Sequence, residues 1–180
     1  MNIRDITPAD APAVLRIYKP YVEQTAITFE IEVPTLDEFS QRIADISARY
    51  PYIVAEDADG TIVGYAYAST FKARAAYRFC VETSIYVDTQ RRHTGIGSLL
   101  HDALEQRLRQ QGVLNMNACI SFIETDDPYL PLDSVGFHHH KGYTRVAHFH
   151  QCGLKFGRWY DMIWMEKIIG PHPLQPENHD

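Results

Sequence analysis

Two glycines and a group of basic residues stand together in the stretch QRRHTGIGSLL, residues 90–100. The residues concerned are Arg91, Arg92, His93, Gly95 and Gly97. An apolar helical pattern begins directly after them, and the start of a helix presents unpaired N–H groups and the positive end of the helix dipole. Such a place suits a phosphate group. The stretch therefore predicts an anion-binding loop, or else an ordinary helix start with two convenient glycines.

Two common nucleotide-binding motifs do not fit this loop. A dinucleotide fingerprint requires a third glycine at position 100, where Leu100 stands. A P-loop requires Gly-Lys-Ser/Thr, whereas Gly97 is followed by Ser98. The loop is therefore an anion-binding loop of another type, or the ordinary helix start.

Glu82 and the histidines are the other residues that could do chemistry. Glu82 lies in CVETSIYVD, which alternates like a strand, and is either a general base or a residue on the exposed face of a half-buried strand. His138 begins a His-His-His run, in which His139 and His140 are alternatives. His148 and His150 alternate on a later strand, but no carboxylate or cysteine nearby completes a metal site, so we expect no metal.

The elements that must position these residues follow from apolar spacing and capping signals. Strands are expected at 2–6, twice within 50–69 around an Asp-Ala-Asp-Gly turn, at 80–88, at 114–122 and twice within 143–168. Helices are expected from Pro8, after Thr35, from Gly95 to Gly112 and over 134–141. The order predicts an α/β protein with one mixed, mostly antiparallel sheet of about seven strands and about four helices.

Bulk properties limit the class of protein. A chain of 180 residues that is 45% hydrophobic predicts one domain, at 1–169, with a proline-rich tail at 170–180 expected to be disordered. The net charge of −6 argues against a nucleic-acid partner. No apolar run approaches a membrane span, and the first residues do not resemble a signal peptide. Three widely spaced cysteines suit the reducing cytoplasm.

The sequence R-x-x-G-x-G at 92–97, after a strand ending IYVD, resembles the acetyl-CoA signature of the GNAT acyltransferase superfamily. Further stretches narrow the resemblance to the branch of the phosphinothricin and methionine sulfoximine N-acetyltransferases. They are AITFE (26–30), YPYIVAE (50–56), VGYAYASTFKARAAY (63–77), VETSIYVD (81–88) and LKFGRWYD (154–161). Their joint order and spacing are specific, and they extend over nearly the whole chain to about residue 168. The resemblance implies a GNAT fold.

The resemblance also implies where acetyl-CoA binds. Its pantetheine arm is expected to bind like an added strand beside Ile85, Tyr86 and Val87, with an amide N–H near Val87 polarising the thioester carbonyl. Its diphosphate is expected in a cradle formed by Arg92, His93, Thr94, Gly95, Ile96, Gly97 and Ser98. Ser134 matches a further position of the family pattern.

Catalysis and acceptor binding are carried over in the same way. Glu82 matches a catalytic glutamate of the family, and His138 fits the family's His-x-x-x-Gly-aromatic pattern. Direct attack by an amine on the thioester is the expected route. The expected acceptor-binding residues are Phe29, Glu30, Phe71, Lys72, Arg74 and Tyr77. Among these, Arg74 suits a bidentate contact with acidic oxygens, although a solvated loop cation would look the same. Family members are homodimers, so a homodimer is expected.

The segment before His138 departs from the family. The usual Asn-Asp-Pro-Ser-Val is PLDSV here, so Pro131 replaces an asparagine that normally contacts the cofactor. The preceding loop, ETDDPY at 124–129, is longer and more acidic than usual.

The reading is an acetyl-CoA-dependent N-acetyltransferase of a small amino-acid-like amine, in the cytoplasm. Two alternatives remain. In the first, the enzyme acts on a different acceptor, which is a polyamine, an aminoglycoside or a protein N-terminus. In the second, the chain is a CoA-binding regulator without turnover. A regulator has no reason to keep both Glu82 and His138.

Overall fold

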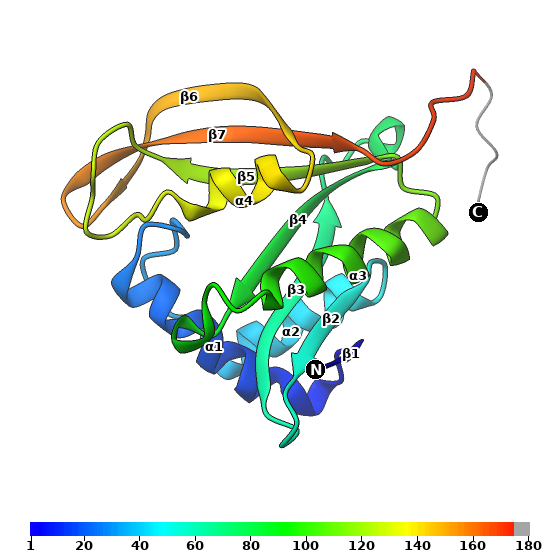
Figure 1. Ribbon diagram of the computed structural model, residues 1–180, viewed down its shortest axis with the longest axis horizontal. Helices are drawn as coiled ribbons and strands as arrows, with labels where there is room; N and C mark the ends of the chain where they lie inside the picture. Colours follow the sequence, from blue (N-terminus) through cyan, green and yellow to red (C-terminus); the bar gives the residue numbers. More distant parts are fainter. Residues whose placement is uncertain (175–180) are drawn as a thin grey trace.

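A computed structural model describes residues 1–174 of the chain. One seven-stranded sheet runs through the molecule in the order β1-β2-β3-β4-β5-β7-β6 (Figure 1). The strands are β1 Asn2–Asp5, β2 Tyr52–Glu56, β3 Ile62–Thr70, β4 Cys80–Val87, β5 Asn115–Phe122, β6 Thr144–Lys155 and β7 Arg158–Ile168. The helices are α1 Ala11–Gln24, α2 Leu36–Ser47, α3 Ile96–Gln110 and α4 Asp133–His140, with short 3-10 turns at Pro8–Asp10, Ala75–Tyr77 and Thr89–Arg91.

Capping residues start the helices where the sequence predicts. Thr35 accepts a hydrogen bond from the Glu38 N–H, while the Glu38 carboxylate accepts from the Thr35 N–H, which completes a capping box. Thr7 and Asp10 form a similar box before α1. Gly95 precedes α3 with a φ of 86°, a left-handed conformation that glycine adopts without strain.

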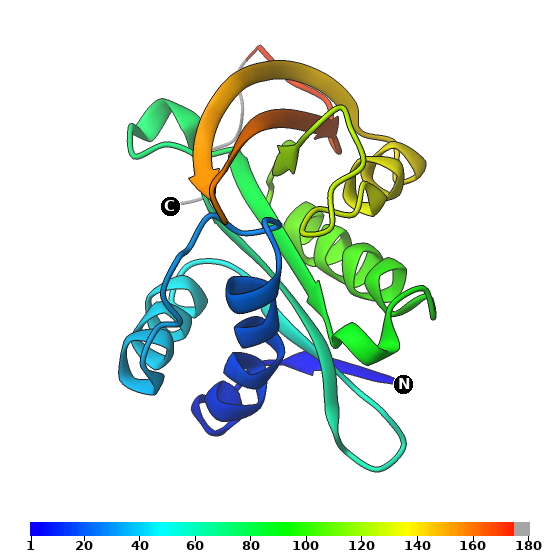
Figure 2. The same cartoon turned by 90° about the vertical axis from the view of Figure 1, so that its left-hand side faces the viewer.

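Helices cover both faces of the sheet. Figure 2 shows α1 and α2 on one side of the central strands and α3 on the other. The core on the α3 side includes Leu100, Leu104 and Met116, and the core on the α1 and α2 side includes Val14 and Tyr65. Each face of the sheet therefore has its own apolar core, and the sheet separates the α3 side of the molecule from the α1 and α2 side.

The sheet splits between β4 and β5. This is its only parallel pair within residues 1–174, and pairing extends only over Cys80–Glu82 against Asn115–Asn117. Beyond that point β4 remains paired with β3, and β5 with β7, as the two strands diverge. Residues 83–87 and 118–122 therefore face each other across a gap.

The predicted order of seven strands and four helices in one mixed sheet is confirmed. Residues 170–174 contain no helix or strand, and the rest of the expected tail, 175–180, lies outside the described residues. Within residues 1–174, no helix is long and apolar enough to cross a bilayer.

Candidate active site

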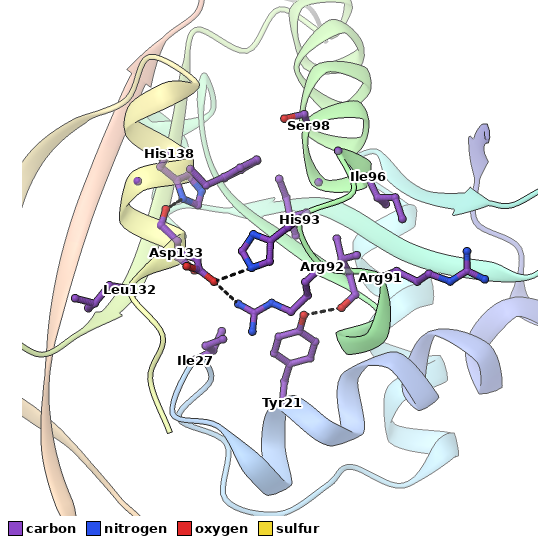
Figure 3. A pocket seen from close by; sticks show the side chains of 17 residues that line it. Tyr21, Ile27, Arg91, Arg92, His93, Ile96, Ser98, Leu132, Asp133 and His138 are labelled. Atoms are coloured by element: carbon purple, nitrogen blue, oxygen red, sulfur yellow. Dashed lines mark hydrogen bonds and ion pairs between the residues drawn. The ribbon is translucent and has the colours of Figure 1, made fainter. Parts of the chain in front are cut away.

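A cleft of about 690 Å³ lies where the start of α3 meets the diverging strands and α4 (Figure 3). Its walls come from four places: the end of β4, the loop leading to α3, the start of α3, and α4 with the residue before it. The α1 helix and the segment after it close one side. The lining residues are Tyr21, Ile27, Ile85, Val87, Arg91, Arg92, His93, Gly95, Ile96, Gly97, Ser98, Leu132, Asp133, Ser134, Gly136, Phe137 and His138.

The two glycines of the loop have different physical roles. Position 95 favours glycine because its φ is positive, not because space is short. A Cβ there would meet no atom within 4 Å. A Cβ on Gly97 would lie 3.6 Å from the Phe137 ring and 3.8 Å from Val87, both of which line the cleft. Gly97 therefore keeps the first turn of α3 open to the cleft, where helix geometry leaves N–H groups without intrahelical acceptors.

Two basic side chains converge on one carboxylate at this end of the cleft. Arg92 donates from Nη2 to Asp133 Oδ2 at 3.1 Å, and His93 Nε2 lies 3.4 Å from the same oxygen (Figure 3). Arg91 turns away instead and pairs with Asp57 at 3.4 Å. The Arg92 guanidinium beside the α3 N-terminus is thus already paired with Asp133. An incoming anion has to compete with the Asp133 carboxylate for it.

The edge of β4 offers backbone hydrogen-bonding groups to the gap. The Asp88 N–H donates to Val63 O on β3, and successive residues of a strand turn these groups to opposite sides. Ile85 and Val87 therefore turn theirs toward β5. The Val87 carbonyl accepts from the Tyr21 hydroxyl at 2.6 Å. Because pairing with β5 ends at Glu82, the N–H groups of Ile85 and Val87 face the gap.

A smaller hollow lies in the gap itself. It is lined by consecutive residues 83–86 of β4 and 118–121 of β5. Since neighbouring residues of a strand point to opposite faces, this lining belongs to both faces of the sheet. The hollow also shares Ile27, Ile85, Ser134 and His138 with the larger cleft. The gap thus connects the cleft with the opposite side of the sheet.

His138 stands where the cleft and the hollow meet. Its Nδ1 lies 2.7 Å from the Ser134 carbonyl, and because a carbonyl only accepts, Nδ1 carries the proton. The ring packs edge-on against Tyr143 and Phe137. Burial lowers the pKa of His138 to about 4, although the bond to Ser134 opposes this shift. His138 is therefore neutral at pH 7, with a lone pair on Nε2.

Glu82 lies at the base of the gap but on the other face. It is the last β4 residue paired with β5, opposite Asn117. Its neighbour Val81 belongs to the core under α3, so the Glu82 side chain points toward the α1 and α2 face. Burial raises the pKa of Glu82, and the positive charge of Lys72 partly opposes the rise. A carboxylate with a raised pKa is a stronger base.

Several aromatic rings lie around Lys72 on the same face of the sheet as Glu82. The Lys72 ammonium lies 5.0 Å from the centroid of the Phe71 ring and 5.4 Å from that of Trp164. Phe71 in turn packs edge-on against Trp164 and Tyr77. Arg74 is exposed on the same loop, before the 3-10 turn.

The two residues expected to close the acceptor pocket have different environments. Glu30 forms an ion pair with Arg42, and its negative charge, like that of Glu82, adds to the burial that raises the pKa of Tyr67. Burial is the main reason that the pKa of Tyr67 is raised. Phe29 packs beneath Gly153 and Tyr160, where a Cβ on Gly153 would come within 3 Å of its ring.

Most of the expected cofactor residues line the cleft. Tyr86 lines only the hollow, and Thr94 lines neither cavity. The Thr94 hydroxyl donates to the Arg91 carbonyl at 2.6 Å. Sequence reasoning missed Tyr21, Leu132, Asp133 and Phe137 in the cleft, and Trp164 beside Lys72. Tyr21 belongs to an ordinary apolar helical stripe, so nothing in the sequence separates it from the core. For Asp133 the sequence did contain a signal, because Asp133 is an acidic residue directly before Ser134, which was expected to bind the cofactor.

The expectation that no carboxylate accompanies His148 and His150 is wrong. The Asp161 carboxylate lies against both histidines, with ligand-capable atoms of all three within 4.8 Å of one another. Antiparallel pairing of β6 and β7 brings Asp161 there from a position distant in sequence.

Comparisons with known proteins agree with this arrangement. The family model described as an acetyltransferase (GNAT) domain matches residues 3–164. The chain is 34% identical over 177 residues to the phosphinothricin N-acetyltransferase of Streptomyces viridochromogenes, covering 98% of this chain and 92% of that protein. It is equally identical, at 34% over 177 residues, to an L-methionine sulfoximine/L-methionine sulfone acetyltransferase of Pseudomonas paraeruginosa, covering 97% and 98%.

A solved structure extends the likeness to three dimensions. The crystal structure of a GNAT superfamily phosphinothricin acetyltransferase from Sinorhizobium meliloti, in complex with AcCoA, superposes with a TM-score of 0.89 at 33% identity. The match covers 99% of this chain and 93% of that one. The GNAT fold expected from the sequence is confirmed, and the chain belongs to the GNAT acetyltransferase family.

Proposed function

We propose that this chain is an acetyl-CoA-dependent N-acetyltransferase whose acceptor is the primary amine of a small amino-acid-like molecule. Phosphinothricin, methionine sulfoximine and methionine sulfone are the acceptors that the names of its relatives suggest. The observation that carries the proposal is the gap between β4 and β5, which lies between the cleft at the start of α3 and the opposite face of the sheet. Three cysteines without a disulfide among the described residues suit a cytoplasmic location.

The cleft suits acetyl-CoA in its charge and its free backbone groups. The N-terminus of α3 and Arg92 would hold the diphosphate, with His93 and Ser98 beside it. The N–H group of Ile85 would pair with the pantetheine arm, as an added strand does, while that of Val87 would face the thioester. The ion pair between Arg92 and Asp133 must then break so that Arg92 can bind the diphosphate.

When bound, acetyl-CoA supplies a thioester whose carbonyl carbon forms a bond to the amine nitrogen as the carbon–sulfur bond breaks and the CoA thiol leaves with a proton. Glu82 receives the proton that the ammonium form of the acceptor must lose, directly or through one water. The N–H of Val87 donates to the carbonyl oxygen as negative charge develops there. His138, neutral at the junction of cleft and gap, is the second group able to accept a proton.

The acceptor would bind on the Glu82 face. Lys72 and Arg74 supply positive charge for its acidic oxygens. Phe71, Tyr77 and Trp164 form an apolar wall against its carbon chain, and Glu30 and Phe29 border the same region.

A homodimer is the proposed assembly. Leu154 and Trp159 are directly paired on the β6–β7 hairpin and are 52% and 56% exposed. A second copy would remove this apolar surface from water. Sedimentation at micromolar concentration measures the assembly, and a single monomeric species would contradict it.

An amine panel tests the proposed function. Wild-type protein and acetyl-CoA are incubated with phosphinothricin, methionine sulfoximine, methionine sulfone, spermidine, an aminoglycoside and a short peptide with a free N-terminus, and acetylated products are measured by mass spectrometry. Turnover is expected with one of the first three, with the highest kcat/KM there. Preference for another amine would reject the acceptor class, and no product with any amine, despite CoA binding, would reject the enzyme.

A further inference from the structure

A second cluster of chemically capable side chains lies away from the cleft, on the β6–β7 hairpin. β6 is the edge strand of the sheet and lies beside β7 (Figure 1). His148 and His150 come from β6, and Asp161 comes from β7. The ligand-capable atoms of the three side chains lie within 4.8 Å of one another. The His148 and Asp161 side chains are only 19% and 17% exposed, whereas His150 is exposed.

An irregularity in the hairpin creates this arrangement. Strand pairing is regular up to Phe149 opposite Met162 and resumes at Gly153 opposite Tyr160, so extra residues of β6 bulge out between them. Gln151, in the bulge, has a φ of 48° and donates its N–H to Asp161 Oδ1 at 2.7 Å. The bond fixes the carboxylate and directs Oδ2 toward His148 Nε2, which lies 2.6 Å away.

The two histidine rings stack with centroids 4.0 Å apart, at 30°. Two imidazole nitrogens and one carboxylate oxygen form the donor set that zinc uses where it keeps one position for water. Calcium and magnesium prefer all-oxygen sites, so they fit less well. The bond between the Gln151 N–H and Asp161 resembles the outer-shell contacts that orient carboxylate ligands.

We propose that His148, His150 and Asp161 form a binding site for Zn²⁺ or a similar divalent transition-metal ion. The metal ion takes the place between His148 Nε2 and Asp161 Oδ2, and the proton on Nε2 moves through water to Nδ1 of the same ring. Small side-chain rotations must then bring the three ligand atoms to about 2 Å from the ion.

A neighbouring cation, Arg145, opposes metal binding. Its removal should therefore change the metal affinity in the opposite direction to removal of a ligand. Arg145 Nη2 lies 2.5 Å from His148 Nδ1 and its guanidinium stacks over the Phe122 ring. With the metal on Nε2, Nδ1 carries a proton and can no longer accept from Arg145. Arg145 must therefore move away, and its positive charge repels the ion. Removing the guanidinium should strengthen metal binding.

The experiment measures Zn²⁺ affinity by competition with a chromophoric chelator, on protein without a histidine tag. Cys119 and Cys152 are changed to Ser in every sample so that exposed thiols do not bind the metal. The expected result is one Zn²⁺ per chain with micromolar or tighter affinity. His148→Ala, His150→Ala and Asp161→Asn should each weaken it at least about tenfold, and Arg145→Gln should strengthen it.

His172→Ala is the matched control, because His172 contacts Asn115 rather than this cluster and should leave the affinity unchanged. Co²⁺ gives a second readout, since its visible absorption should report a four-coordinate site in the parent and lose that form in His148→Ala. His150 is exposed, so its substitution keeps the test valid even if Asp161→Asn fails to fold. Absence of saturable binding, or equal affinity in His150→Ala and the control, would overturn the proposal.

Discussion

Glu82 and His138 show how burial acts on groups of opposite charge type. Burial disfavours the charged form, so it raises the pKa of the Glu82 carboxyl and lowers that of the His138 imidazole. Glu82 becomes a stronger base, and His138 stays neutral. The two residues approach the gap from opposite faces of the sheet, and Glu82 is on the face proposed for the amine. Glu82 is therefore the better placed proton acceptor.

Glu82→Gln tests that assignment at nearly constant shape. Because an amide cannot accept the proton, kcat should fall about 10²–10⁴-fold, with acetyl-CoA affinity nearly unchanged. In the wild type, kcat/KM should fall as the pH drops through the raised pKa of Glu82, since only the carboxylate accepts a proton. That acidic limb should be absent from the variant. Glu23→Gln, an exposed change on α1, is the control, and unchanged turnover in Glu82→Gln would remove Glu82 from the mechanism.

His138 should give the free energy of unfolding a dependence on pH. Its pKa is about 4 in the folded chain and about 6.5 when exposed, so the unfolded chain binds the extra proton between these values. Stability is retained above pH 6.5 and is lost as the pH falls toward 4, by up to about 3 kcal/mol. Urea unfolding of His138→Gln should lack this part of the loss. Parallel stability curves for the two proteins would contradict the buried neutral histidine.

Asp133 should weaken cofactor binding, because it occupies Arg92 and lies near His93. Asp133→Asn removes a negative charge from the proposed diphosphate site, so acetyl-CoA should bind a few-fold more tightly, by about 1 kcal/mol or less. Calorimetric titration at low salt measures the change, with Asp37→Asn on α2 as the control. Weaker binding in Asp133→Asn would show that the carboxylate contributes to the site instead.

At the scale of elements, local signals in the sequence were sufficient for the helices and strands. The Thr35–Glu38 capping box, the glycine before α3 and the Asp-Ala-Asp-Gly turn each act over a few residues, and each appears where expected. Most residues of the expected cradle could likewise be predicted to line one cleft, because helix start, glycines and basic residues are contiguous in the chain.

Contacts made between distant elements could not be predicted in this way. Tyr21 reaches the Val87 carbonyl from α1, and Asp161 reaches His148 through a bulge whose size no local pattern specifies. The family resemblance supplied Glu82 and His138, but it did not indicate that Asp133 pairs with Arg92. That pair joins the loop before α3 to the first residue of α4, two segments that lie 41 residues apart in the sequence.

The loop between β5 and α4 depends on one buried carboxylate. The Asp127 side chain is fully buried and accepts from Arg158 at 2.7 Å, the Tyr160 hydroxyl at 3.1 Å and the Tyr129 N–H at 2.8 Å. Burial raises its pKa, but these donors outweigh burial and the net pKa is lowered. Asp127→Ala should destabilise the fold by about 1–3 kcal/mol, measured by urea unfolding. A loss no greater than that of the exposed Asp126→Ala would contradict this role.

At the scale of the whole molecule, the sheet separates two tasks. The α3 side holds the cleft proposed for acetyl-CoA, the other side holds Glu82 and the aromatic rings around Lys72, and the gap between β4 and β5 lies between them. In the proposed reaction, this arrangement brings the thioester and the amine together without a covalent intermediate on the protein.

Direct transfer is the central claim, and the mass balance of one reaction tests it. Wild-type protein, acetyl-CoA and the preferred amine are sampled over time, and acetylated amine, free CoA and intact protein mass are measured together by mass spectrometry. The account predicts equal amounts of acetylated amine and free CoA, with the protein mass unchanged throughout. A protein that gains and then loses an acetyl group during turnover, or that binds CoA but acetylates no amine, would contradict it.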